Sequence, residues 1–168
     1  MPRKCVNSSA AFCYICGEVI FKSQGQSFAP LIKKYYELYF GCKVDDQDKS
    51  WAPHFCCVTC ARHLVEWTKG SCCMPFAIPM VWREPTDHVS YCYFCLTNIT
   101  GVTAKTKNNV KYPNLPSTMR SVPHSAELSV PKPPTNMMPS DSESSDEDVG
   151  QANNNMDCIS VFQLFALN

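Results

Sequence analysis

The sequence has few glycines, little charge and no long apolar segment. Only 6 of its 168 residues are glycine, and 18% are charged. The most apolar run, MPFAIPMVW at residues 74–82, is short and is broken by two prolines, so nothing in the chain is long enough to span a bilayer. The N-terminus, MPRKCVNSSAAFCYICGEV, has no apolar stretch of signal-peptide length. These absences predict an intracellular protein with no membrane partner.

Cysteine, by contrast, is abundant. The chain has 12 cysteines, and 11 of them lie between Cys5 and Cys95. Such a density indicates either a disulfide scaffold or metal sites, and the redox compartment decides between them. In a reducing intracellular compartment the thiols stay available for metal, so we expect metal sites.

Composition divides the chain into three parts. Residues 1–11 are a flexible lead-in, residues 12–112 are the predicted zinc-binding domain, and residues 113–168 are a Pro-rich and acidic-Ser tail that we expect to be mostly disordered. Residues 1–112 hold 13 Lys and Arg against 8 Asp and Glu, a net charge of +5, whereas residues 113–168 hold 2 against 7, a net charge of −5. A basic front half and an acidic tail are found in nucleic-acid-associated proteins, which favours a nuclear location.

Within residues 12–112 the sequence predicts both helices and short strands, and therefore a small α+β fold. One helix is predicted between Ser27, as N-cap, and Gly41, with Pro30 in its first turn. A second helix should begin in the Cys57–Cys60 turn and end at Gly70. Residues 76–82 suit an irregular strand interrupted at Pro79, and residues 99–103 and 110–112 suit a small hairpin.

Two C-x-x-C turns predict a first zinc site. A structural zinc takes four nitrogen or sulfur ligands, commonly as two pairs supplied by short turns. A C-x-x-C-G turn followed, after a long insertion, by a C-x-x-C turn that opens a helix is the pattern of a treble-clef zinc knuckle. The ligands of this site are then Cys13, Cys16, Cys57 and Cys60.

A third C-x-x-C turn predicts a second zinc site. If ligand pairs alternate between two ions along the chain, as in a cross-braced module, this turn shares its ion with nearby histidines. The predicted ligands are His54, His88, Cys92 and Cys95. His124 and Cys42 compete with His54 for the fourth position. Cys56 is interpreted as a packed apolar residue, because Cys57-x-x-Cys60 already has the knuckle spacing.

The same ligand count argues against catalysis. A zinc held by four protein ligands has no open position for a water molecule. The C-x-x-C turns also lack the βαβ context of a thioredoxin-like redox site. We therefore expect no enzyme activity, no catalytic residues and no small-molecule substrate, with two zinc ions as the only cofactors.

Several blocks resemble known families. WAPH before Cys57-x-x-Cys60, and PMVWREP before His88-x3-Cys92-x-x-Cys95, resemble a family that is numerous in invertebrate genomes, whose abundance suggests a mobile-element origin and which has no established activity to carry over. The resemblance covers about residues 12–150 and departs at the terminal ISVFQLFALN. The first half is also similar to the zinc-finger-associated domain of arthropod transcription factors, a treble clef that mediates dimerisation. That similarity implies self-association through an apolar helix.

The function predicted from these patterns is a non-catalytic zinc-binding module for protein–protein or nucleic-acid contact. Lysines that could face phosphate are scattered: Lys33, Lys34, Lys43, Lys105, Lys107 and Lys111. The rival is a RING-like ubiquitin ligase, because His54-x2-Cys57-x2-Cys60 followed by Cys92-x2-Cys95 fits the back half of that pattern. A third alternative is a fragment of a mobile element without a selected activity.

Overall fold

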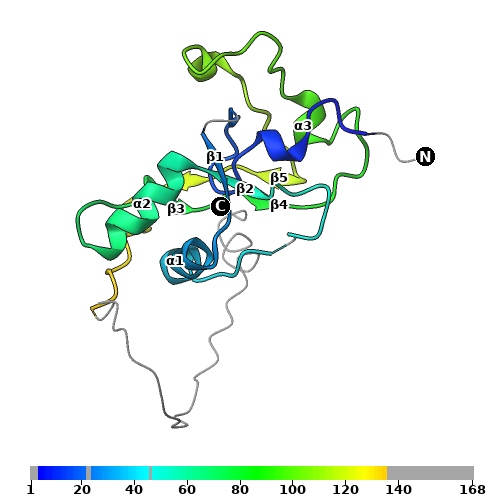
Figure 1. The fold of residues 1–168 in the computed structure, drawn as a ribbon. Helices are drawn as coiled ribbons and strands as arrows, with labels where there is room; N and C mark the ends of the chain where they lie inside the picture. Colours follow the sequence, from blue (N-terminus) through cyan, green and yellow to red (C-terminus); the bar gives the residue numbers. More distant parts are fainter. Residues whose placement is uncertain (1–3, 22–23, 46, 136–168) are drawn as a thin grey trace.

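The computed structural model describes residues 4–21, 24–45 and 47–135 and has a small mixed α+β fold, which confirms the predicted class (Figure 1). Its helices and 3-10 turns are η1 (Ser9–Ala11), α1 (Pro30–Phe40), α2 (Val58–Thr68), α3 (Tyr93–Leu96) and η2 (Lys107–Asn109). Its strands are β1 (Gly25–Ser27), β2 (Phe55–Cys57), β3 (Phe76–Ile78), β4 (Val81–Trp82), β5 (Thr118–Met119) and β6 (Val122–Pro123).

Helix α1 begins and ends at residues whose backbone preferences fit those positions. Pro30 is its first residue, where a missing N–H costs nothing, and Gly41 ends it with φ 69°, a left-handed conformation that glycine adopts easily. The N-cap is Ala29, which makes no side-chain cap bond, whereas the predicted cap, Ser27, lies in β1 opposite Phe55.

Helix α2 begins where the cysteine spacing predicted. Cys57 is its N-cap, and the Cys57 Sγ accepts a hydrogen bond from the backbone N–H of Cys60 at 3.4 Å. The helix buries Cys60, Ala61, Leu64 and Trp67, and it packs against α1 through an edge-to-face contact of Trp67 with Tyr39. The helix that carries two cysteines is therefore anchored in the core by its own apolar face.

The three small sheets tie distant segments together. Strand β1 pairs with β2, β4 with β5 and β3 with β6, all antiparallel. Strands β5 and β6 lie in the segment that the sequence assigned to the tail, and Thr118 in β5 is buried. Trp67 also donates a hydrogen bond to the Pro131 carbonyl at 2.9 Å. The described fold thus continues well past residue 112, and the predicted disorder of residues 136–168 lies outside the described residues.

The hairpin predicted over residues 99–112 is not formed. These residues instead make consecutive turns and η2, and they extend away from the rest of the molecule at the top of Figure 1. In place of strand pairing, the Tyr112 hydroxyl accepts a hydrogen bond from the backbone N–H of Val19 at 3.0 Å. The segment is thereby attached at its base to the turn that follows Cys16.

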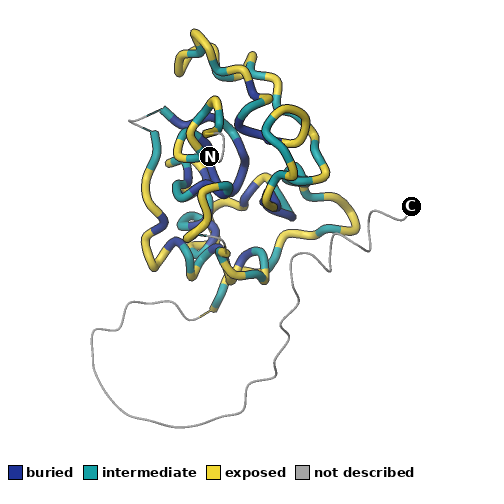
Figure 2. Tube along the Cα trace, turned by 90° about the vertical axis from the view of Figure 1, so that its right-hand side faces the viewer, coloured by how far each residue is buried: buried dark blue, intermediate teal, exposed yellow. Residues whose placement is uncertain are grey.

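The core surrounds the first C-x-x-C turn. Phe12 and Ile15, which flank Cys13 in this turn, are fully buried. The backbone of the turn is held by the PMVW segment, because Met80 N donates to the Ile15 carbonyl at 2.9 Å and Trp82 Nε1 donates to the Tyr14 carbonyl at 2.8 Å. Figure 2 shows the buried trace running through the interior, with exposed residues along the outer loops.

Candidate metal centres

The first group of potential ligands brings together the four cysteines that the sequence predicted. The Sγ atoms of Cys13, Cys16, Cys57 and Cys60 all lie within 4.8 Å of one another, and only Cys57 is more than marginally exposed. Cys13 and Cys16 come from a tight turn closed by a Phe12–Val19 bridge, and the other two come from the start of α2. A parallel bridge between Cys13 and Phe55 brings the two pairs together.

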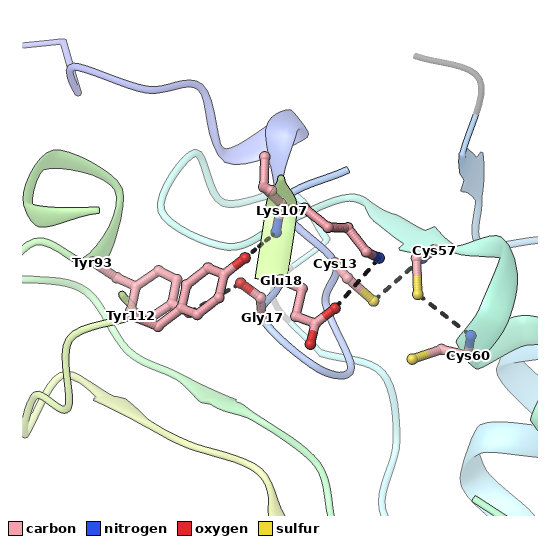
Figure 3. Close-up of polar contacts among 9 residues, drawn as sticks. Cys13, Gly17, Glu18, Cys57, Cys60, Tyr93, Lys107 and Tyr112 are labelled. Carbon is pink, nitrogen blue, oxygen red and sulfur yellow. Dashed lines mark hydrogen bonds and ion pairs between the residues drawn. The ribbon is translucent and has the colours of Figure 1, made fainter. Parts of the chain in front are cut away.

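The cysteines of this group shift one another's pKa values, because their sulfur atoms are hydrogen-bonded to one another. Hydrogen bonds from Cys13, Cys16 and Cys60 hold the pKa of Cys57 well below its usual range, whereas hydrogen bonding among the same thiols raises the pKa values of Cys16 and Cys60. The backbone N–H of Cys57 also donates a hydrogen bond to Cys13 Sγ at 3.3 Å (Figure 3). A divalent cation would let all four sulfurs ionise together.

A second group forms around the third C-x-x-C turn, and it includes a residue that the sequence did not predict. Its members are Cys5, His88, Cys92 and Cys95, whose ligand atoms all lie within 4.8 Å of one another. Cys5 approaches His88 Nδ1 at 3.4 Å and Cys92 Sγ at 3.6 Å, and Cys95 Sγ lies 3.7 Å from the same nitrogen. Burial is the first cause that raises the pKa of Cys5, to about 12, followed by its hydrogen bond with Cys92.

These separations fit a tetrahedral zinc. With Zn–S near 2.3 Å and Zn–N near 2.0–2.1 Å, tetrahedral geometry places neighbouring ligand atoms roughly 3.5–3.8 Å apart. The separations of 3.4, 3.6 and 3.7 Å among the atoms of the second group lie close to this range. The first group offers four sulfur donors and the second offers three sulfurs and one imidazole, and zinc accepts both sets, so each group could hold one zinc ion.

Cys5 reaches the second group because the N-terminal segment is bound against α3. The Asn7 side chain donates to the carbonyls of Phe94 and Thr97 at 2.6 and 2.7 Å, and Val6 N donates to Cys95 Sγ at 3.4 Å. In Figure 1 this segment and η1 run beside α3. Sequence spacing could not reveal this contact, because Cys5 is 83 positions from His88 and has no partner nearby in the chain.

His54 is the predicted ligand that the structure does not bring into the second group. It lies next to the group and lines, with Cys5 and His88, a hollow of about 680 Å³. Its predicted competitors are also elsewhere. His124 is hydrogen-bonded to the Tyr39 hydroxyl at 2.7 Å and to the Leu128 carbonyl at 3.0 Å, and Cys42 lies 3.9 Å from the Tyr36 hydroxyl.

The order of the two groups along the chain corrects the cross-braced expectation. Cys5 precedes both pairs of the first group, and His88, Cys92 and Cys95 follow both pairs. The ligand sets are therefore nested, with the first group enclosed by the second, and they do not alternate. Cys56, which is fully buried in β2, belongs to neither group.

The two groups are connected by one side chain. Tyr93, between the two cysteines of the third C-x-x-C turn, donates a hydrogen bond to the Gly17 carbonyl at 3.0 Å, directly after Cys16. Its ring stacks on Tyr112 at 6.1 Å (Figure 3), and Arg120 Nη1 donates to its hydroxyl at 2.8 Å. Ordering of one C-x-x-C turn therefore supports the other.

Comparisons with protein-family models, curated proteins and solved structures found no match, so the site is interpreted from its own geometry. Within the part of the chain that the structure describes, no helix is long and apolar enough to cross a membrane.

Proposed function

We propose that the protein is a non-catalytic, intracellular zinc-binding module that holds two structural zinc ions and serves macromolecular contact, with a nuclear location. The observation that carries the proposal is the presence of two four-ligand groups of cysteine and histidine. Four protein ligands leave no open coordination position, so neither ion would activate water or polarise a substrate. The predicted Cys13-x-x-Cys16 turn and the Cys57-x-x-Cys60 helix start support a treble-clef assignment for the first group.

The experiment that tests the zinc-dependent fold is a titration of zinc into the reduced, metal-free full chain, followed by circular dichroism and by one-dimensional NMR of the ring protons. We expect native structure to appear in proportion to added zinc and to be complete at two equivalents, because zinc binding supplies much of the folding free energy of small metal domains. A chain that folds fully in the presence of a chelator would contradict the proposal.

The RING-like alternative loses support from the nested ligand order, since that class requires alternating pairs. An autoubiquitylation assay with a generic conjugating enzyme should show no product above a Cys57→Ser control.

Self-association through α1 remains part of the proposal, supported by Leu31 and Leu38. These side chains are 54% and 42% exposed and lie seven positions apart, on one face of the helix. The dependence of the sedimentation coefficient on concentration, with Leu38→Glu as the comparison, tests this contact.

The resemblance to mobile-element-derived proteins accords with this function, and the two blocks that carry the resemblance lie beside predicted zinc ligands. Met80 and Trp82 of PMVWREP hold the backbone of the first C-x-x-C turn, and Pro53 and His54 of WAPH lead into β2, which carries Cys57. Both blocks thus position zinc ligands. Expression of a fluorescently tagged chain in insect cells tests the nuclear location, and diffuse cytoplasmic signal would contradict it.

A further inference from the structure

One stretch of the chain has basic side chains and no carboxylates. The 39 residues 88–126 contain Lys105, Lys107, Lys111 and Arg120 but no aspartate or glutamate. Three of these four lie in residues 101–111, here called the basic loop. In Figures 1 and 2 the basic loop extends from the top of the molecule, far from α1, and Figure 2 shows it as mainly exposed.

The lysines of the basic loop differ in their surroundings. Lys107 Nζ lies 3.6 Å from Glu18 Oε2, so its charge is partly compensated (Figure 3). Lys105 and Lys111 are exposed, and neither forms an ion pair with any residue that the structure describes. Both ammonium groups are therefore available to an external anion.

The basic loop is held in one shape. Turn hydrogen bonds join Thr106 N to the Thr103 carbonyl and Asn109 N to the Thr106 carbonyl, both at 3.0 Å. At its base, Tyr112 is bonded to Val19 and stacked on Tyr93, and the Arg120 guanidinium lies 4.8 Å from the centre of the Tyr112 ring. A loop fixed in this way loses less conformational entropy on binding than a flexible lysine-rich tail would.

From these observations we propose that the basic loop is a phosphate-contacting surface for nucleic acid, with Lys105 and Lys111 as the principal contacts. This inference rests on the proposed function and names the partner class for its contact surface. Exposed, uncompensated lysines on a carboxylate-free projection suit a polyanion with regularly spaced charges. The exposed amide side chains of Asn108 and Asn109 can hydrogen-bond phosphate oxygens. Base sequence is not read by this surface.

Binding of a 20-base-pair DNA duplex, and of an RNA duplex of the same sequence, to the full chain over a range of salt concentrations tests the proposal. The test variant is Lys105→Ala/Lys111→Ala. The matched control is Lys33→Ala/Lys34→Ala on α1, which removes the same net charge at the other end of the molecule (Figure 1). Zinc is measured in every sample.

Each lysine–phosphate contact contributes a slope of about −0.9 to a plot of log K against log salt for duplex DNA. The loop variant should therefore bind with a slope shallower by about two, which corresponds to a loss of roughly 60-fold in affinity at about 0.1 M salt when the affinity at about 1 M salt is unchanged. The α1 control should keep the wild-type slope.

Several results would overturn the proposal. One is an equal loss of duplex affinity in both variants, which would mean that only the net charge of the protein matters. Another is the absence of salt-dependent binding to either duplex by a chain that holds two zinc ions. Binding to phosphatidylserine vesicles, without binding to either duplex, would also overturn it. A chain that lacks zinc would contradict the module itself, so the two failures are distinguishable.

Discussion

Replacing Cys5 by serine isolates the contribution of the N-terminal segment to the second group. Structural zinc sites in small domains bind with roughly 10–16 kcal/mol at neutral pH, so one of four equal ligands accounts for about 3 kcal/mol, or about a hundredfold in zinc affinity. The first group should survive, because Cys5 is not one of its ligands, and the N-terminal segment should stay on α3, because Asn7 keeps its hydrogen bonds to Phe94 and Thr97. We therefore expect Cys5→Ser to weaken one zinc site and to leave the other unchanged.

A competition titration with a chromophoric zinc chelator measures both affinities in one experiment. His54→Asn is the matched control, because His54 lies beside the second group, in the same hollow, without belonging to it. The control should show two wild-type affinities. If His54→Asn lost the zinc of the second group while Cys5→Ser retained it, the assignment of Cys5 as a ligand would be refuted.

The remaining predictions concern the core of the domain, the first group and the release of zinc by acid. Gly17→Ala should lower the free energy of unfolding by more than Gly41→Ala does. Both glycines have positive φ, which costs an L-residue about 1–2 kcal/mol. Only at Gly17 would an added Cβ also clash, because it would lie 2.6 Å from Met80 Cε and 3.0 Å from the Tyr93 hydroxyl. Urea unfolding of both variants checks this, and equal losses would contradict a tight contact there. Cys57→Ser should abolish zinc binding at the first group and unfold the domain. Cys56→Ser should leave the zinc count unchanged and lower the free energy of unfolding by about 1–3 kcal/mol, because it buries a hydroxyl. Loss of a zinc ion from Cys56→Ser would instead show that Cys56 is a ligand. Zinc affinity should fall as the pH falls, because the raised pKa values of Cys5, Cys16 and Cys60 keep these thiols protonated in the metal-free chain, and binding must release their protons. Zinc release recorded with a metal indicator between pH 8 and 5 tests the sign, and release that increased with pH would contradict it.

The first group could be predicted from sequence because its chemistry is local. Each C-x-x-C turn brings two sulfurs together through its own backbone, and the second turn is continuous with a helix whose apolar spacing is readable. The ends of the helices at Gly41 and Gly70 were predictable for the same reason, since φ is positive at both.

The rest depends on contacts between distant segments. Cys5 is brought to its group by hydrogen bonds from Val6 and Asn7 to residues near position 95, and no periodicity marks such a contact. Strands β5 and β6 have two residues each, too few to show the alternation that identifies a strand, and they lie in a segment rich in proline. The prediction of His54 depends on the alternating ligand order of a cross-braced module, and that order does not apply once the ligand sets are nested.

Native mass spectrometry of the full-length chain tests the central claim most directly, because it counts metal ions on an intact protein. The account predicts a mass increase of two zinc ions per chain, with a chelator removing the zinc of the second group faster than the zinc of the first group. That order is expected because three ligands of the second group are partly exposed, against one in the first. A wild-type chain that carries a single zinc, or none, would contradict it.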